Sequence, residues 1–373
     1  MNAAEAAGQT ELQQLMYSII QRVATGPDLS KDISQEEARM GMRGVLQGEI
    51  DPVRSGIFLI ALRMKRETDE ENRGILQAIL DTRIGVTAEV DEVLDIADPY
   101  DGYNRTIPAS PFLAPLLAEC GVPTVTHGLE AVGPKYGITH RQCLSAAGVP
   151  VDLEPEAAAA RLADPAIGWS YVDQARYAPK LHDLIALRQR MVKRSVITTV
   201  EVLGRPISGR KRTHFMTGYV HKPYPPIYAD LARCAGFDSA IIMRGVEGGV
   251  IPSLRQPGKY FAYHEGGAEI PYDIDPALVA IEQEQRAVPI PDDVPQSSRG
   301  EGAITVTDVA AGARKAAELG LAALRGEKGP TYDSLVYSGA VVLKHLGRAP
   351  DLAQAAEQVR AVLDSGRAAD RVR

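Results

Sequence analysis

The sequence predicts an α/β protein in two parts: a small N-terminal helical domain and a larger α/β domain with a mostly parallel central sheet. Two observations lead to this prediction. Up to residue 83, apolar residues recur at helical spacing, with turn residues between the runs. After residue 84, short β-branched runs alternate with helical stretches, which is typical of a parallel sheet covered by helices.

Four helices are expected in the N-terminal part. The first carries an apolar stripe along one face, formed by Leu12, Leu15, Met16, Ile19, Ile20 and Val23. Capping boxes open the second and fourth helices, at Ser34 with Glu37 and at Thr68 with Glu71. Pro52 suits the first turn of the third helix. Short helices joined by tight turns predict a helical subdomain.

The α/β part is expected to contain strands at residues 122–126, 196–202 and 239–243. Helices are expected at residues 110–120, 226–235, 307–324 and 352–363. Residues 258–299 are rich in proline, glycine and charge. The pattern there predicts loops, with a strand or two that it does not place.

Composition indicates a folded protein, because 45% of the 373 residues are hydrophobic and 24% are charged. The longest apolar runs are too short to span a bilayer, and the N-terminal residues have no secretory pattern, so a cytoplasmic protein is expected. Cys120, Cys143 and Cys234 are too few and too far apart to predict a disulfide framework or a zinc site. Three buried, reduced thiols are expected.

Charge is distributed unevenly on a chain whose net charge is −7. Residues 173–212 hold ten basic and three acidic residues, a local charge of +7. Such a segment is a candidate site for anions or nucleic acid, and an ordinary solvated helix face is the alternative. The candidate contacts are Arg188, Arg190, Lys193, Arg210, Lys211 and Arg212.

Two long stretches resemble the anthranilate phosphoribosyltransferase family of glycosyltransferase family 3. They are GVLQGEIDPVRSGIFLIALRMKRETDEE near the N-terminus and YSGAVVLKHLGRAPDLAQAAEQVRAVLDSGRA near the C-terminus. The resemblance implies a cleft between the two domains and a homodimer through the helical domain. It also implies domain boundaries, with residues 1–83 and part of about 175–195 in the helical domain, and residues 84–174 and 196–373 in the α/β domain.

The family grips pyrophosphate with a Gly-Thr-Gly-Gly-Asp loop and a following Thr-x-Asn-x-Ser-Thr stretch, and this chain departs from both. Asp98 and Asp101 stand where two glycines are expected, and Pro99 has no N–H to donate. Thr106 and Ser110 survive from the second stretch. The resemblance leaves these candidate ligand-binding residues: Asp101, Gly102, Asn104, Arg105, Thr106 and Ser110.

The family's other binding elements are only partly kept. His127 and Gly128 remain from a Lys-His-Gly-Asn segment, although a structural histidine is the alternative interpretation of His127. Arg194 matches an arginine that contacts anthranilate in the family, and a salt bridge is its alternative role. The Asp-Glu pair that holds magnesium aligns with Val250 and Ile251, which cannot bind a hard cation. No metal or other cofactor is therefore expected. Glu247 lies nearby and is a further candidate ligand-binding residue, as are His127, Gly128 and Arg194.

The replaced motifs are most similar to the TrpD-like, YbiB-type group, whose characterised members bind nucleic acid. The resemblance thus implies a homodimeric protein that binds nucleic acid or a phosphorylated small molecule, without anthranilate phosphoribosyltransferase activity. An altered phosphoribosyl or glycosyl transferase, or a phosphorylase acting on a ribosyl substrate, is the alternative, and Asp101, Asn104, Arg105 and Thr106 would then form its site. A scaffold without small-molecule chemistry is a third possibility.

Overall fold

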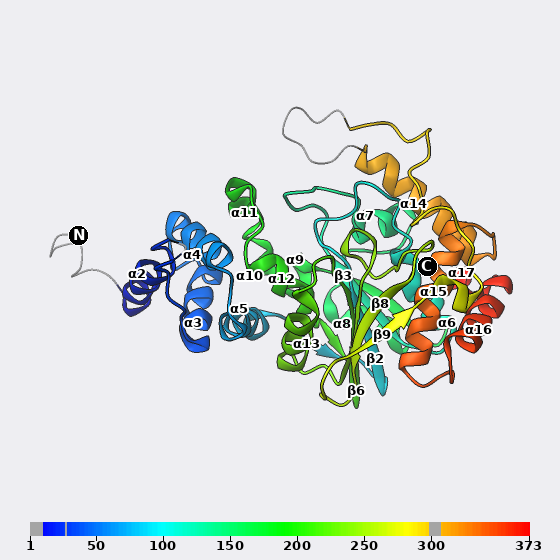
Figure 1. Ribbon diagram of the computed structural model, residues 1–373, viewed down its shortest axis with the longest axis horizontal. Helices are drawn as coiled ribbons and strands as arrows, with labels where there is room; N and C mark the ends of the chain where they lie inside the picture. The colour runs from blue at the N-terminus through cyan, green and yellow to red at the C-terminus, as the bar shows by residue number, and fades with distance from the viewer. Residues whose placement is uncertain (1–9, 27, 298–306) are drawn as a thin grey trace.

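The computed structural model describes residues 10–26, 28–297 and 307–373. A bundle of four helices forms its N-terminal end, and a larger α/β domain forms the rest (Figure 1). The bundle consists of α2 (Glu11–Val23), α3 (Gln35–Leu46), α4 (Pro52–Lys65) and α5 (Asp69–Thr82). The expected capping boxes are present at Ser34 with Glu37 and at Thr68 with Glu71, and the side chain of Asp51 caps α4 ahead of Pro52.

The α/β domain is built on a seven-stranded sheet in the order β4-β3-β2-β6-β7-β8-β9. Its strands are β2 (Glu92–Ala97), β3 (Thr124–Gly128), β4 (Trp169–Asp173), β6 (Arg212–Gly218), β7 (Ser239–Met243), β8 (Gly258–Tyr263) and β9 (Ile270–Ile274). The first five in the order pair in parallel, and β8 and β9 are added antiparallel. A separate parallel pair joins β1 (Val86–Thr87) to β5 (Ile207–Ser208).

Helices cover both faces of the sheet, so alternate residues of β2 enter two cores. Val93 and Ala97 join the core that extends into the helical bundle, whereas Leu94 and Ile96 face the core under the C-terminal helices. The remaining helices are α6 (Leu113–Glu119), α7 (His140–Ala146), α8 (Pro155–Ala163), α9 (Gln174–Tyr177), α10 (Pro179–His182), α11 (Ile185–Met191), α12 (Ile197–Val200), α13 (Tyr224–Cys234), α14 (Val309–Leu324), α15 (Pro330–His345), α16 (Leu352–Asp364) and α17 (Arg367–Asp370), and α11 contacts α4 of the bundle.

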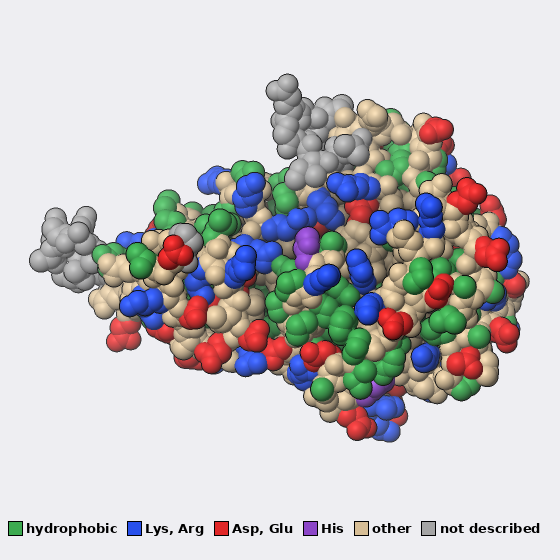
Figure 2. All heavy atoms as spheres, in the orientation of Figure 1, with side chains coloured by type: hydrophobic (Ala, Val, Ile, Leu, Met, Phe, Trp, Pro, Cys, Tyr) green, Lys and Arg blue, Asp and Glu red, His purple; other side chains and the backbone are tan. Residues whose placement is uncertain are grey.

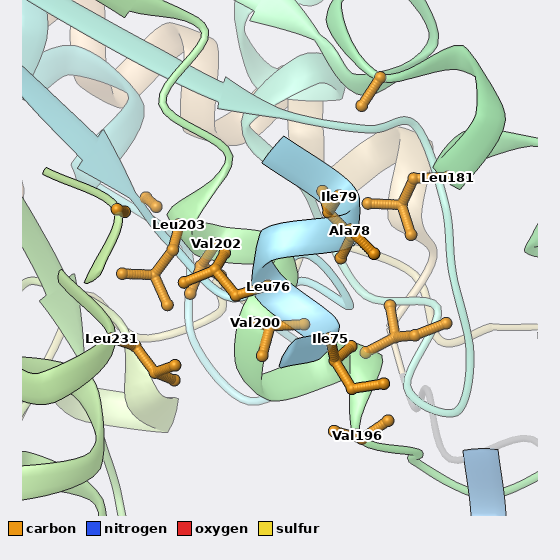
Figure 3. Packing of buried hydrophobic residues seen from close by; sticks show 14 of the residues in the cluster. Ile75, Leu76, Ala78, Ile79, Leu181, Val196, Val200, Val202, Leu203 and Leu231 are labelled. Carbon is orange, nitrogen blue, oxygen red and sulfur yellow. The ribbon is translucent and has the colours of Figure 1, made fainter. Parts of the chain in front are cut away.

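Helix α5 is the apolar bridge between the two domains. Its buried residues pack against α12, α13 and the turn after α12, and Figure 3 shows this contact, which includes Ile75, Leu76, Ile79, Val200, Leu203 and Leu231. Two polar contacts reinforce it: Arg63 donates to the Tyr224 hydroxyl at 2.7 Å, and Arg73 pairs with Asp230 at 2.5 Å. The bundle is therefore fixed against the sheet domain.

One strand prediction was wrong. The β-branched run at residues 196–202 forms α12 and a 3-10 turn rather than a strand. Val196, Ile197 and Val200 are buried against the helical bundle, and this packing outweighs their preference for strands. In residues 258–299, the unplaced strands are β8 and β9.

Two of the three cysteines are less buried than expected. All three cysteines are free, but only Cys143 is buried, whereas Cys120 and Cys234 are half-buried. Burial raises the pKa of Cys120 to about 12, so its thiol is a weak nucleophile at neutral pH. Across the described ranges, none of the helices combines the length and the apolar character needed to cross a membrane.

A histidine cluster lies at the end of the sheet where β6 and β7 begin. The Ser239 hydroxyl lies 2.8 Å from Nδ1 of His214 and 2.8 Å from Nε2 of His345. His264 stacks on His345 with ring centroids 4.2 Å apart. Burial, with a smaller contribution from neighbouring basic groups, lowers the pKa of His214 to about 4 and the pKa of His345 to about 3.

We expect this cluster to make the protein less stable in mild acid. Both pKa values in the folded protein are below the ordinary 6.5. In mild acid the unfolded chain therefore binds more protons than the folded chain does. The stability that is present above pH 6.5 is lost as the pH falls toward the pKa values of the folded protein. Each histidine should contribute a loss of about 2 kcal/mol between pH 6.5 and 5. Urea unfolding at several pH values measures this loss, and His345→Gln should flatten the dependence. An unchanged slope in that variant would count against the assignment.

Candidate functional site

The candidate site lies at the carboxyl end of the parallel strands, which is the end of the sheet where open α/β proteins bind their ligands. From β2 the chain continues to β3 on one side, while β6 pairs with the other side of β2. Loops that leave the carboxyl ends of strands diverge at such a switch point and leave a crevice. Here the converging loops are residues 98–106 after β2, residues 219–223 after β6 and residues 244–250 after β7.

Asp98, the first residue after β2, holds the inner part of this site together. Its Oδ2 accepts hydrogen bonds from Tyr103 at 2.7 Å and from the Ser110 hydroxyl, and lies 2.8 Å from Nε2 of His140. Its Oδ1 accepts from the backbone N–H of Val250 at 2.9 Å. The carboxylate is buried, and its oxygens face protein donors rather than a ligand.

The charge of Asp98 is stabilised by these neighbours. Burial alone would raise its pKa, but His140 and the hydroxyls of Ser110 and Tyr103 reverse the effect and lower it. Gly249 allows the close packing, because a Cβ there would lie 1.6 Å from the Tyr103 hydroxyl oxygen. Asp98 therefore remains a carboxylate inside the protein.

Glu247 is the second carboxylate of the site, and it lies in a cradle of donors on the loop after β2. Its oxygens accept hydrogen bonds from the backbone N–H groups of Asn104 at 3.2 Å and Arg105 at 3.0 Å. The Thr106 hydroxyl donates at 2.9 Å. Four of the sequence-predicted site residues thus come together, with Asn104, Arg105 and Thr106 donating to Glu247.

Asp101 connects the loop to the segment that runs beside the helical bundle. Arg194 donates to its Oδ2 through Nη2 at 2.5 Å and Nε at 3.1 Å, and Lys135 lies 3.6 Å from Oδ1. Lys135 also donates to the backbone oxygen of Gly102 at 3.0 Å. The salt bridge considered for Arg194 is therefore present, although its side chain is 41% exposed and accessible to solvent.

His127 is buried in a polar chain. Its Nε2 lies 2.7 Å from Asp95, its Nδ1 bonds the Tyr100 hydroxyl, and Tyr100 in turn lies 2.7 Å from the hydroxyl of Tyr177. None of the ring is exposed, so it has the structural role considered as the alternative. Gly128 ends the same strand, paired with Asp173 of β4.

The positions that match the family's metal ligands are apolar and buried. Val250 and Ile251 belong to the core under the C-terminal helices. The hollow between residues 103–109 and this loop measures about 10 Å³, room for at most one water molecule. A larger hollow of about 570 Å³ lies between α7 and α14, and none of the site residues described above line it.

The basic segment does not form a single surface. Arg188 is buried and makes two hydrogen bonds of 2.7 Å to Glu201, so it is not available to a ligand. Arg190 and Lys193 are exposed, in the last turn of α11 and just after it. The six candidates therefore do not share one surface: three lie on or just after α11, and one of these three is buried.

The other three candidates, Arg210, Lys211 and Arg212, lie at the opposite end of the sheet. Arg212 begins β6 and Gly218 ends it, which separates this cluster from the crevice by about 20 Å. Each of its cations is paired with an acid, the partners being Glu89, Asp91 and Glu92. Its charge is locally balanced.

Several residues of the site were not predicted. Lys135 lies between β3 and α7, His140 begins α7, and Tyr103 lies in the loop after β2. Lys135 stands in a Gly-Pro-Lys-Tyr-Gly sequence typical of a turn, and His140 follows a capping box at Thr139. Neither local pattern indicates that the side chain reaches the loop after β2.

We predict that Asp98 is structurally essential while Asp101 is not. Asp98→Ala removes the acceptor of four buried donors and should lower the free energy of unfolding by about 3–5 kcal/mol. Asp101→Ala leaves Arg194, whose side chain is 41% exposed and can be hydrated, and should cost about 1–2 kcal/mol. Urea denaturation of both variants measures the difference. Equal losses in the two variants would contradict this assignment.

Comparisons with known proteins agree with this architecture. Residues 17–82 match the helical bundle domain of the glycosyl transferase family, and residues 101–369 match its a/b domain. The chain is 26% identical over 340 residues to an anthranilate phosphoribosyltransferase of Novosphingobium aromaticivorans, covering 91% of this chain and 94% of that protein. It is 33% identical over 230 residues to an uncharacterized protein of Aquifex aeolicus, covering 62% and 68%.

Solved structures share the fold. The anthranilate phosphoribosyltransferase of Thermus thermophilus superposes with a TM-score of 0.69 at 21% identity over 95% of both chains. The Saccharomyces cerevisiae enzyme in complex with PRPP and Mg has a TM-score of 0.72 at 15% identity over 96% of both chains. With its helical bundle, its mostly parallel sheet and both family domains matched, the chain belongs to the glycosyl transferase family of the anthranilate phosphoribosyltransferases.

Proposed function

We propose that this protein binds the phosphate backbone of nucleic acid on the rim of its crevice and does not transfer phosphoribosyl groups to anthranilate. The observation that carries the proposal is a set of exposed cations on α11, on the segment after it, and on the loops after β2, β6 and β7, here called the basic rim: Arg105, Arg190, Lys193, Lys222 and Arg244. Figure 2 shows Lys and Arg side chains gathered on this face where the helical bundle meets the α/β domain.

The inside of the crevice argues against the transferase reaction. A relative of known structure is described in complex with PRPP and Mg. In this chain the carboxylates of Asp98 and Glu247 already accept hydrogen bonds from donors of the loops after β2 and β7, and a pyrophosphate group there would meet like charge. Val250 and Ile251 offer no oxygen ligand at the metal position. A departing pyrophosphate would therefore lack the electrostatic stabilisation that the reaction needs.

The protein should accordingly fail to make phosphoribosyl-anthranilate. Expressed in a tryptophan auxotroph that lacks the pathway enzyme, it should not restore growth without tryptophan, while an active anthranilate phosphoribosyltransferase does. Immunoblotting for soluble protein controls for expression. Growth of the complemented strain would refute this part of the proposal.

The basic rim differs from the other cationic clusters in being unpaired. Among the described residues, Arg105, Arg190, Lys193, Lys222 and Arg244 form no salt bridge, whereas the cluster at the start of β6 is fully paired. Unpaired, exposed cations release counterions from nucleic acid most effectively, because binding does not first break an ion pair. The net charge of −7 opposes association, so we expect weak binding that is strongest at low salt.

Binding should therefore depend on the basic rim and not on the paired cluster. A triple variant with Arg190→Ala, Lys193→Ala and Arg244→Ala should weaken binding of a labelled single strand and reduce the salt slope by about two units, at about −0.7 per phosphate contact. The matched control with Arg210→Ala, Lys211→Ala and Arg212→Ala should leave the slope unchanged. Fluorescence anisotropy from about 50 mM salt upward measures both.

Two outcomes would contradict the proposal. One is the absence of binding to single- or double-stranded nucleic acid by the unmodified protein at low salt. The other is a larger effect from the control triple than from the rim triple.

We also propose that the protein is a homodimer, formed through α4. The apolar stripe on α2 is used within the bundle, because Met16, Ile19 and Val23 are buried there. On α4, Val53 and Met64 are 71% and 76% exposed, and Ile57 lies between them on the same face. Exposed apolar residues aligned on one helix face favour association.

The dimer should be sensitive to charge on α4 alone. The unmodified chain should be a dimer at micromolar concentration by light scattering, and Val53→Glu with Met64→Glu should yield a folded monomer. Leu278→Glu is the matched control, because Leu278 is an exposed apolar residue of the α/β domain. A monomeric unmodified chain, or a dimer that survives the α4 substitutions, would refute the interface.

A further inference from the structure

Hydrophobic and aromatic side chains are exposed on the face of the molecule that carries the basic rim. Figure 2 shows hydrophobic side chains gathered in the middle of this face, in the region of α13 and β8, with Lys and Arg side chains beside them. The loop after β6 contributes Val220, which is 52% exposed, and the exposed ring of His221. Exposed apolar groups that gather in one place mark a surface that binds a partner.

The sheet leaves Phe261 of β8 open to this surface. Phe261 pairs with Ile242 of β7, which belongs to the core that extends into the helical bundle, so both side chains point to the face on which α13 packs. Pro271 of β9 pairs with Phe261 and is exposed. The helical cover of this face therefore ends at β8, and Phe261 is half-buried rather than enclosed.

Three more rings line the path from the end of β6 to the start of α13. Tyr219 contacts Phe261 edge to face, with ring centroids 6.1 Å apart, and supports it from below because Tyr219 itself is buried. The rings of His221 and Tyr224 lie 6.4 Å apart. These side chains, here called the aromatic platform, are Tyr219, Val220, His221, Tyr224 and Phe261. Packing already holds the platform in place, so a ligand need not order it.

Cations border the aromatic platform. Lys222 lies in the loop after β6, and Arg244 lies in the loop after β7; both are exposed. The backbone N–H of Arg244 donates to the backbone oxygen of Lys259 at 3.2 Å, which places this loop beside the start of β8. Lys259 shares a face of β8 with Phe261 and pairs with the exposed Asp273 at 3.3 Å. Flat apolar rings beside free cations suit an anionic polymer that carries flat apolar groups.

We propose that the aromatic platform binds the unpaired bases of a single-stranded nucleic acid, which stack on Phe261 and His221 while Lys222 and Arg244 contact the neighbouring phosphates. The bases of a duplex already stack and pair with one another, so the platform favours single strands over double strands. This inference rests on the proposed binding of nucleic acid and adds which part of the nucleic acid the surface recognises. Stacking tolerates every base, so the preference for sequence is weak.

The test compares a labelled thymidine oligonucleotide with an abasic strand of the same length, by fluorescence anisotropy at about 50 mM salt. The unmodified chain should bind the thymidine strand about tenfold more tightly than the abasic strand. Phe261→Leu combined with His221→Ala should remove most of this difference and leave the affinity for the abasic strand and the salt slope unchanged. Tyr17→Ala is the matched control and should change neither affinity, because Tyr17 is an aromatic residue of α2 that is 39% exposed.

Phe261→Trp provides a second measurement that removes no ring from the platform. Trp169 is the only tryptophan of the chain and is buried, so a change in tryptophan emission reports on position 261. The thymidine strand should quench this emission, whereas the abasic strand should not, because only the former carries bases to stack on the indole.

The outcomes separate this inference from the proposed function. Equal affinities of the unmodified chain for the two strands, or emission of Phe261→Trp that the thymidine strand leaves unchanged, would overturn the inference and leave phosphate-backbone binding by the basic rim intact. Absence of binding to both strands would overturn the two together. Retention of the chain on vesicles of anionic phospholipid, with equal affinities for the two strands, would assign the surface to a membrane instead.

Discussion

The buried carboxylate of Asp98 is the interaction on which the rest of the site depends. It gathers donors from the loop after β2, from the start of α7 and from the loop after β7, and thereby fixes three segments that are far apart in the sequence. A buried charge is tolerated only when it is paired and hydrogen-bonded, and these partners meet that condition. Because Asp98 holds Val250, the neighbouring Glu247 can reach the donors of the facing loop.

Acidic side chains on the converging loops limit what the site can bind. The glycosyl transferase family fold places converging loops at the switch point of the sheet, and in this chain acidic side chains occupy them. Asp101 faces Arg194, Glu247 faces the loop after β2, and Asp98 faces the interior. The exposed cations of the basic rim lie outside this network of acidic side chains. Anion binding is accordingly proposed at the surface.

Much of the fold could be predicted from the sequence, because caps and apolar periodicity are local signals. The capping boxes at Ser34 and Thr68 identify helices α3 and α5 correctly. The strand expected at residues 196–202 failed because burial against the bundle, a tertiary effect, outweighed local preference. The site was harder, since the partners of Asp98 and Glu247 lie 5 to 152 residues away and no spacing rule reveals them. The same holds for the basic segment, whose charge sum could not show that Arg188 is buried against Glu201.

Our central proposal is that carboxylates of the chain itself occupy the place of the pyrophosphate and that Val250 and Ile251 leave no magnesium site beside them. Calorimetric titration of PRPP into the unmodified protein, with and without millimolar magnesium, tests it most directly. We predict no saturable heat of binding at micromolar PRPP and no effect of magnesium. Magnesium-dependent binding of PRPP with a micromolar dissociation constant would contradict the proposal.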